Sequence, residues 1–515
     1  MLAKCYSGAI SGVDARTVEI EVFSSIGTSQ FAIVGLPDAA VKEAKDRIPA
    51  ALKNQGFKAS KEYDVMVNLA PADVKKEGPI YDLPIAICLL QATGRLRNAC
   101  LSEYAFVGEL ALSGEVRRVK GVLPIVIEMR RIGRRAVIVP EENAEEASVV
   151  RGIDVIPVRS LREAVEYMNG EISIVPRQTD LEALVLRGAD ECDDFADVKG
   201  QYSARKAIEV AVAGGHNLLM IGSPGSGKTM LARRIPSILP PLTVDEALEV
   251  SRIHSVAGGE KGGRAFLARR PFRAPHHTAS SIGLLGGGVH PVPGEVSLAH
   301  RGVLFLDEFA EFPRNVLEVL RQPLEDGHVC VSRAAATHDF PSKFMLVAAM
   351  NPCPCGYRGD PRRQCRCKVR DVLRYQSRIS GPLLDRIDIQ IEVPPVDPKA
   401  LPVLERGESS AAIRARVMEA RAVQAARYKG MPGVHTNADV RSADLSDACR
   451  FTAEDRAKLV RLIERVNISA RAYDKVLRVA RTFADLAGSE KVRDEDIKSA
   501  LGYRRMDDEE SSYWA

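Results

Sequence analysis

Leu218-Leu-Met-Ile-Gly-Ser-Pro-Gly-Ser-Gly-Lys-Thr229 is the stretch that decides the fold of this chain of 515 residues. Its first four residues are apolar and predict a buried strand, and the rest fits the pattern G-x-x-x-x-G-K-[ST] at every fixed position. A helix should follow from Lys228 to about Arg234, with its positive end toward the loop. The loop that we expect to bind nucleotide phosphates consists of Gly222, Ser223, Pro224, Gly225, Ser226, Gly227, Lys228 and Thr229.

The residue types in this loop match the chemistry of a nucleoside triphosphate bound with Mg²⁺. Glycine has no Cβ, so backbone N–H groups can close around phosphate oxygens. Lys228 can reach the β- and γ-phosphates, and the Thr229 hydroxyl can bind Mg²⁺. A chance match to the pattern is a poor explanation, because an apolar strand precedes the loop and a helix is expected after it.

Two further apolar stretches end in polar side chains that suit hydrolysis. Val303–Leu306 predicts a strand that ends at Asp307 and Glu308. We expect Asp307 to hold Mg²⁺ through its water shell and Glu308 to orient and deprotonate the attacking water. Phe344–Met350 predicts a third strand, which ends at Asn351, and an amide there can position that water or contact the γ-phosphate.

Composition and charge limit the classes of function. The net charge of +4 is mildly basic, so a nucleic-acid partner has to be argued from local basic patches. Aromatic residues make up only 5% of the chain, which argues against stacking on many exposed bases. The N-terminal residues contain no apolar signal segment and no run of about 18 apolar residues occurs, so we expect a cytoplasmic protein without membrane contact.

Residues 1–175 predict a domain that mixes helices and strands. Alternating apolar residues predict strands over Val18–Phe23, Phe31–Val34, Tyr63–Leu69 and Ala136–Val139. Helices are expected over Asp38–Asn54, Leu83–Leu90 and Leu161–Met168, the first with Asp38 as its cap.

This block resembles the proteolytic domain of Lon-type proteases over the stretches Leu69–Ala86 and Gly108–Gly121. The resemblance places a catalytic Ser after the Gly-Pro pair and a partner Lys a few residues after the second stretch. Here Ile80 and Leu123 stand at or near those positions, and a Ser–Lys nucleophile needs both groups. The resemblance therefore implies a degenerate, structural or oligomerising domain. Its basic residues are either DNA contacts or a solvated face: Lys75, Lys76, Arg117, Arg118 and Lys120.

The order of phosphate loop, acidic strand, Asn351 strand and Leu383-Leu-Asp-Arg386 is identified as that of an AAA+ ATPase module. This resemblance makes Arg386 an arginine finger that acts on the nucleotide of a neighbouring subunit, which requires a ring or filament. It also implies a helical lid whose sensor residue, Arg471, contacts the γ-phosphate, with Arg478 as second choice. The lid helices are expected over Phe451–Val466, Ser469–Leu486 and Arg493–Leu501.

Two inserts point to a subgroup of these ATPases. Arg273–Gly288 looks like a helix-2 insert, and His328–Phe340 looks like a β-hairpin ahead of the Asn351 strand. With the Lon-like block, this layout resembles the magnesium-chelatase-like AAA+ ATPases of the ComM (YifB-like) competence family. The resemblance implies a homo-hexamer that uses ATP and Mg²⁺ to drive branch migration of DNA in natural transformation or homologous recombination. Arg333, Arg362 and Arg363 are the expected contacts to single-stranded or branched DNA.

Four cysteines form a separate cluster directly after Asn351. Cys353, Cys355, Cys365 and Cys367 form two close pairs, which can complete a tetrahedral Zn²⁺ site. Free buried or redox-active thiols are the alternative. The adjacent His276 and His277 suit a contact to DNA or a hydrogen bond at the nucleotide interface better than a metal.

The predicted fold class is α/β, and two other functions stay open. A chelatase-type motor would remodel a protein partner, and an ATP-dependent protease is weakened by Ile80 and by the missing lysine. The predicted parts are a Lon-protease-like domain at 1–175, a linker at 176–195, an AAA+ core at 196–395 with a Cys-rich insert at 353–367, a connector at 396–435 and a helical lid at 436–515.

Overall fold

The phosphate-loop strand lies near one edge of a parallel sheet of five strands in the order β11-β14-β17-β10-β18. These strands are β11 (Phe272–Arg273), β14 (Val303–Leu306), β17 (Met345–Met350), β10 (Leu218–Ile221) and β18 (Ile389–Glu392). β10 pairs with β17 on one side and β18 on the other, so Leu218 lies between Val347 and Ile389. The carboxyl ends of β10, β14 and β17, where the polar residues follow, therefore meet at one edge of the sheet.

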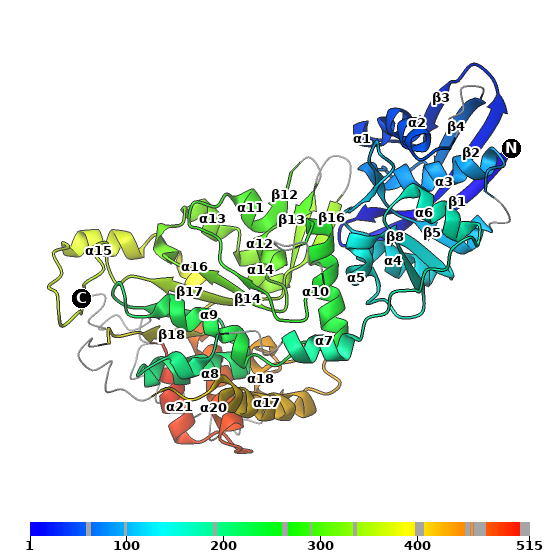
Figure 1. Ribbon diagram of the computed structural model, residues 1–515. Helices are drawn as coiled ribbons and strands as arrows, with labels where there is room; N and C mark the ends of the chain where they lie inside the picture. Colours follow the sequence, from blue (N-terminus) through cyan, green and yellow to red (C-terminus); the bar gives the residue numbers. More distant parts are fainter. Residues whose placement is uncertain are drawn as a thin grey trace. The chain divides into compact units, whose positions relative to one another are not determined.

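The computed structural model describes the chain except for residues 58–62, 97–99, 189–192, 260–265, 289–290, 333–336, 397–405, 449–453, 455–456, 458–469 and 505–515; side chains at 185–188, 446, 448 and 470–472 are also outside the description. The chain divides into two units, each taken by itself below (Figure 1). The first comprises Met1–Leu184, Val244–Leu267 and Ser332–Phe340, and the second comprises Val185–Thr243, Ala268–Val331 and Pro341–Ala515.

Alternating side chains of the parallel sheet pack in two hydrophobic cores, one on each face, as expected for a sheet covered on both faces. On one face, Leu218, Phe305 and Val347 pack in a core shared with longer helices of the second unit. On the other face, Leu219 and Leu304 belong to a core formed with shorter helices and turns. Every residue of β10, β14 and β17 is buried.

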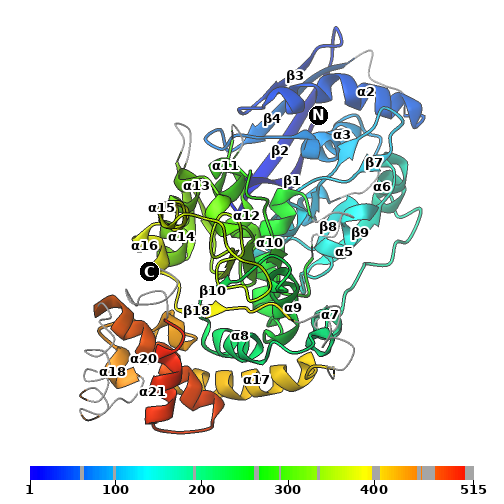
Figure 2. The same cartoon turned by 90° about the vertical axis from the view of Figure 1, so that its left-hand side faces the viewer.

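The second unit contains longer and shorter helices. The longer ones are α8 (Tyr202–Gly214), α9 (Lys228–Ile238), α15 (Val369–Gln376), α17 (Ser410–Arg427), α20 (Ala470–Leu486) and α21 (Asp494–Leu501). The shorter ones are α11 (Ser281–Leu285), α12 (Glu295–Leu298), α13 (Arg314–Glu318), α14 (Arg321–Asp326), α16 (Gly381–Leu384) and α18 (Leu445–Ala448). In two views α17 lies alongside α8 and α20 (Figures 1 and 2). The helix expected over Phe451–Val466 falls almost entirely outside the described residues.

The two segments predicted as inserts each contain a short two-stranded sheet. The first carries α11 and a two-stranded sheet of β12 (Gly286–Gly287) and β13 (Val292–Pro293). The second is the predicted hairpin, with β15 (His328–Ser332) and β16 (Thr337–Pro341) as its two strands. The tip that carries Arg333 lies outside the described residues.

The first unit is built on a mixed sheet of seven strands in the order β3-β4-β2-β1-β5-β8-β9. β1 (Leu2–Ser11) and β4 (Tyr63–Ala70) pair antiparallel with the long central strand β2 (Asp14–Ile26). The remaining strands pair in parallel with their neighbours: β3 (Phe31–Val34), β5 (Tyr104–Phe106), β8 (Ala136–Pro140) and β9 (Asp154–Val158). A further two-stranded sheet joins β6 (Glu109–Leu110) and β7 (Val116–Arg117).

The helices of this unit differ from the prediction at two points. The helix expected over Asp38–Asn54 is divided at Glu43 into α1 (Ala39–Lys42) and α2 (Ala44–Asn54), with Asp38 accepting from the Val41 N–H at 2.8 Å as the predicted cap. The predicted linker at 176–195 contains a helix, α7 (Leu181–Gly188). The composition of the whole segment conceals the short apolar run of this helix. The others are α3 (Asp82–Ala92), α4 (Val122–Arg131), α5 (Ala144–Ala147) and α6 (Leu161–Met168).

One helix from the middle of the sequence belongs to this first unit. α10 (Val244–Ala257) packs against α4, and the Ser255 carbonyl accepts from the Gly121 N–H at 3.0 Å. The Arg252 guanidinium forms an ion pair with Asp14 at 2.7 Å. Among the described residues, no helix is long and apolar enough to cross a membrane.

Candidate nucleotide-binding site

The phosphate loop joins β10 to α9. It requires glycine where its backbone lies close to another segment or has a positive φ. A Cβ on Gly222 would lie 2.3 Å from the Val393 carbonyl oxygen, closer than any side chain tolerates. Gly227 has a φ of +94°, in the left-handed region that favours glycine. The Gly222 N–H donates to the carbonyl of Met350 at 3.2 Å, which ties the loop to the end of β17.

The ammonium of Lys228 lies at the centre of this loop. It donates to the carbonyls of Gly222 and Ser223 at 2.7 and 3.1 Å and to the side-chain oxygen of Asn351 at 3.4 Å. Burial lowers the pKa of Lys228, while the nearby Asp307 carboxylate acts in the opposite direction. The structure thus brings together Lys228 and Asn351, two residues that the sequence places 123 positions apart.

The two predicted Mg²⁺ ligands are also neighbours. The Thr229 hydroxyl donates to the Asp307 carboxylate at 2.7 Å. The other oxygen of Asp307 accepts from the Glu308 N–H at 2.9 Å. A hydroxyl beside a carboxylate at the start of a helix is an oxygen-rich site of the kind that Mg²⁺ prefers.

Glu308 has an unusual backbone and an unexpected partner. Its φ of +51° places a residue other than glycine in the left-handed region, a conformation that clusters at functional sites. Its carboxylate lies 2.9 Å from Nδ1 of His277, in the first insert. The His277 ring also stacks near His276 at 4.1 Å and meets the ring of Phe312 edge-on at 6.4 Å. The sequence pointed to a nucleotide-interface hydrogen bond or a DNA contact for this histidine pair but gave no signal that His277 would contact Glu308, the predicted base.

Gln201 borders the loop from the other side. Its side-chain amide donates to the carbonyls of Ser226 and Pro394 at 3.0 and 2.7 Å. Its backbone also has a positive φ, of +53°. Gln201 therefore connects the start of α8 to the phosphate loop.

Among the described side chains, Arg386 and Arg478 have partners other than the phosphate loop. Arg386 donates to the Pro382 carbonyl at 3.0 Å and forms an ion pair with Glu325 of α14. Arg478 donates to the carbonyl of Val440 at 2.9 Å. Arg471 lies on α20, but its side chain is among those not described.

The predicted lid forms hydrogen bonds with the residues that follow Arg386. The Ile387 carbonyl accepts from the ammonium of Lys475 on α20 at 3.3 Å and from Arg504 at 2.6 Å. The Gln390 N–H donates to the Tyr503 carbonyl at 2.8 Å. These contacts join the arginine-bearing segment to the helices that follow it.

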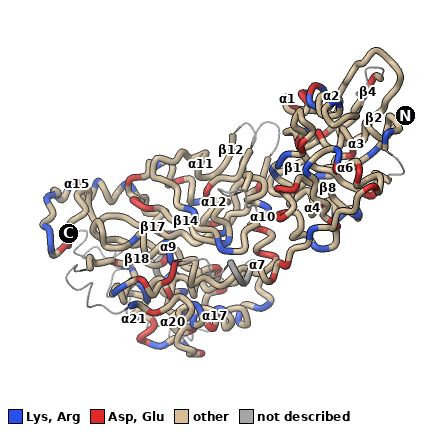
Figure 3. The backbone as a smooth tube through the Cα atoms, in the orientation of Figure 1, with Lys and Arg blue, Asp and Glu red and all other residues tan. Residues whose placement is uncertain are grey.

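The predicted DNA contacts after β17 lie on a basic loop (Figure 3). Arg362 forms an ion pair with Asp360 at 3.1 Å. The Arg363 guanidinium stacks on the ring of Tyr357 at 4.1 Å. In the first unit, Lys76 cannot serve as the DNA contact that the sequence allowed, because it is fully buried and its ammonium donates to the Pro71 carbonyl.

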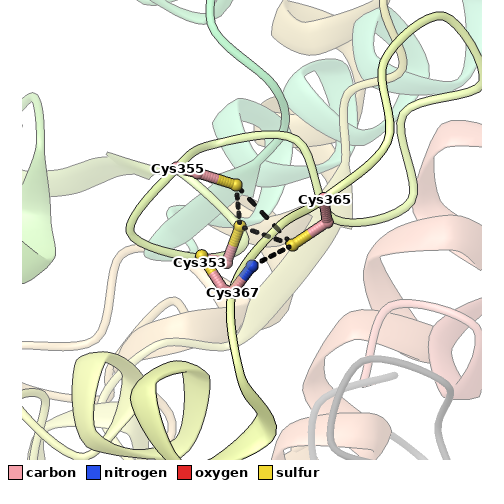
Figure 4. A group of neighbouring side chains, drawn as sticks. All are labelled: Cys353, Cys355, Cys365 and Cys367. Atoms are coloured by element: carbon pink, nitrogen blue, oxygen red, sulfur yellow. Dashed lines mark hydrogen bonds between the residues drawn. The ribbon is translucent and has the colours of Figure 1, made fainter.

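Four sulfur atoms of the same loop converge (Figure 4). Cys353 Sγ lies 3.4 Å from Cys355 Sγ and 3.7 Å from Cys365 Sγ, and the latter two are 3.6 Å apart. Cys367 completes the group, since all four sulfurs lie within 4.8 Å of one another. The chemistry of this donor set suits a thiophilic cation such as Zn²⁺.

The Lon-like positions carry no nucleophile or base. Ile80 lies buried in a turn of 3₁₀ helix at Pro79–Tyr81, and Leu123 is fully buried in α4. Neither side chain has a group that titrates or attacks a carbonyl carbon.

Sequence profiles of magnesium chelatase match three parts of the chain: subunit ChlI of Mg-chelatase over residues 19–143, magnesium chelatase, subunit ChlI over 194–401, and its C-terminal region over 407–504. The chain is 43% identical over 509 residues to the competence protein ComM of Haemophilus influenzae, covering 98% of both proteins. It is 41% identical over 509 residues to the protein YifB of Escherichia coli, covering 98% and 97%. A stretch of 146 residues, 28% of this chain and 19% of the relative, is 28% identical to Lon protease homolog 2 of Caenorhabditis elegans.

Proposed function

The chain belongs to the magnesium-chelatase-like family that includes ComM and YifB, and from this premise we propose that it is an ATP-dependent DNA motor. Magnesium-chelatase-like AAA+ proteins bind ATP with Mg²⁺, and the site has the residues for both. The motor acts as a homo-hexamer and drives branch migration of DNA in natural transformation or homologous recombination. It is a cytoplasmic protein in this proposal, and its Lon-like block is not a protease.

The observation that carries the ATPase is the meeting of five side chains at one edge of the parallel sheet. Lys228 and Asn351 share a hydrogen bond at 3.4 Å, and Thr229 and Asp307 share one at 2.7 Å, with Glu308 next in the chain. Lys228 holds the β- and γ-phosphates, and Thr229 and Asp307 hold Mg²⁺, which neutralises charge that develops on the phosphates. Glu308 takes the proton from a water that Asn351 orients.

Arg386 completes the site from a neighbouring subunit in this proposal. In its own chain it pairs with Glu325, and among the described residues it forms no hydrogen bond or ion pair with the phosphate loop. Assembly would exchange the Glu325 carboxylate for the γ-phosphate of the adjacent subunit. Arg471, on α20, is the proposed contact from the lid to the nucleotide of its own chain.

DNA is the proposed substrate because the similarity to ComM, a protein named for competence, extends over 98% of the chain. Three basic residues come before or after β17 in the sequence. Arg333 precedes β17, and Arg362 and Arg363 belong to the loop that follows it. The match of chelatase profiles to three parts of the chain favours a second candidate, a motor that remodels a protein partner.

The rate of ATP hydrolysis separates these candidates. If DNA is the substrate, adding forked or single-stranded DNA at low salt raises the ATPase rate of the assembled protein. The Lys228→Ala variant is the negative control, since it lacks the ammonium group that holds the phosphates. An ATPase rate that forked DNA leaves unchanged, with the assembled ring present, contradicts the DNA proposal and leaves the protein-remodelling candidate.

A further inference from the structure

Three sulfurs of the cysteine cluster have the spacing of a tetrahedral zinc site, and the fourth lies close by. A Zn–S bond of about 2.3 Å places the sulfurs of a tetrahedron about 3.8 Å apart. The separations among Cys353, Cys355 and Cys365 are 3.4, 3.6 and 3.7 Å, close to that edge. All four sulfurs lie within 4.8 Å of one another, and the Cys367 N–H donates to Cys365 Sγ at 3.4 Å.

The loop that holds these cysteines has little else to fix its shape. Residues 351–368 contain no helix or strand. Cys353 is buried, whereas Cys355, Cys365 and Cys367 are partly exposed. In a segment of this kind, the free energy of metal binding is also the free energy that orders the loop.

The ordered loop forms one wall of the phosphate site. The turn at Gly356 approaches the phosphate loop so closely that a Cβ there would lie 2.7 Å from Cδ of Pro224. The same Cβ would lie 3.8 Å from the amide carbon of Asn351. Gly356 is therefore in contact with both the phosphate loop and the residue that hydrogen bonds with Lys228.

Asp360 pairs within the cysteine loop itself. The Arg362 guanidinium donates to the Asp360 carboxylate at 3.1 Å and holds the pKa of that carboxyl well below its usual range. The cysteine loop meets the phosphate loop at Gly356, which faces Pro224.

We propose that a Zn²⁺ ion bound by Cys353, Cys355, Cys365 and Cys367 holds the phosphate loop in the conformation that binds Mg-ATP. The inference rests on the ATPase of the proposed function but not on DNA as its substrate. The metal is structural and takes no part in the chemistry of hydrolysis. Loss of the metal weakens nucleotide binding because the wall at Gly356 no longer has a fixed position.

The experiment measures zinc content and nucleotide binding on the same full-length samples, without DNA. Zinc is counted by plasma mass spectrometry, and the Kd of a fluorescent ATP analogue is measured with Mg²⁺. The test variant is Cys365→Ser/Cys367→Ser, and the matched control is Cys100→Ser/Cys330→Ser, which changes two exposed cysteines outside the cluster. Wild-type protein is also stripped with phenanthroline, which binds zinc in preference to magnesium, and then refilled with ZnCl₂.

Wild type and control should each carry about one zinc per chain, and the test variant almost none. The Kd for the ATP analogue should rise about tenfold in the test variant and in stripped wild type, and refilling should restore it. Less than about one zinc per two wild-type chains overturns the metal assignment. Zinc loss with an unchanged Kd overturns the coupling. If circular dichroism shows that the test variant does not fold, the stripped and refilled wild type decides.

Discussion

Replacing Gly356 with alanine tests the contact between the cysteine loop and the phosphate loop without disturbing any cysteine. Gly356 and Gly359 lie in the same loop and have similar φ values, +82° and +76°. Alanine in this left-handed region costs about 1–2 kcal/mol at either position. Only at Gly356 does the new Cβ meet another segment, because a Cβ on Gly359 has no heavy atom within 4 Å. Gly359→Ala is therefore a control with the same backbone strain and no contact.

The size of the effect follows from the distances. The Cβ of alanine at Gly356 would lie 2.7 Å from Pro224 Cδ, and ordinary van der Waals contact begins at 3.4 Å. The proline ring is fused to the backbone, so the phosphate loop itself has to move by about 0.7 Å. A misplacement of about 1 Å in a catalytic site can cost roughly a hundredfold in rate. We expect kcat/KM for ATP to fall about ten- to a hundredfold in Gly356→Ala.

Steady-state ATPase assays and thermal melts of both variants check this reasoning. Gly359→Ala should keep kcat/KM within about twofold of wild type, while both variants lose similar amounts of Tm. Equal losses of kcat/KM in the two variants would refute the argument, because backbone strain alone would then explain the effect.

Three more variants test individual residues of the site. Glu308→Gln should lower kcat by about 10²–10⁴-fold while ATP binding stays intact, and a normal turnover rate in this variant would remove Glu308 as the base. His277→Ala frees the Glu308 carboxylate from a partly exposed partner worth about 0.2–1 kcal/mol, so the rate without DNA should rise up to about fivefold with KM unchanged; a lower rate would contradict a restraining role. Arg386→Ala should lower kcat of the assembled protein by about 10³-fold or more, measured at a protein concentration that preserves the ring, and near-normal activity would exclude a finger role.

The sequence predicted three strands of the parallel sheet, β10, β14 and β17, because each is a wholly buried apolar run. It did not predict β11 and β18, which are not wholly buried. β10 and β14 have the predicted bounds, and β17 differs from its prediction by one residue, Phe344, which lies outside the strand. In the first unit β1 was missed, since its run of Gly, Ser and Lys conceals the alternation that its pairing with β2 reveals.

Local sequence patterns could not predict contacts between residues that are distant in the sequence. The contact between His277 and Glu308 spans two segments that only the folded sheet brings together. The ion pair of Arg386 with Glu325 likewise depends on tertiary packing. The position of α10 in the first unit depends on hydrogen bonds that Ser255 accepts from the N–H groups of Gly121 and Leu123, far away in the sequence. A local pattern identified the four cysteines, but not the contact of their loop with the phosphate loop at Gly356.

Strand separation by the wild-type protein with ATP and Mg²⁺ tests most directly whether it is a motor for branched DNA, on three labelled substrates: a Holliday junction, a fork and a plain duplex. We expect ATP-dependent processing of the branched substrates, with the plain duplex left intact and the Lys228→Ala protein inactive on all three. Robust ATP hydrolysis with no change in any of the three substrates would contradict the claim that this protein is a motor for branched DNA.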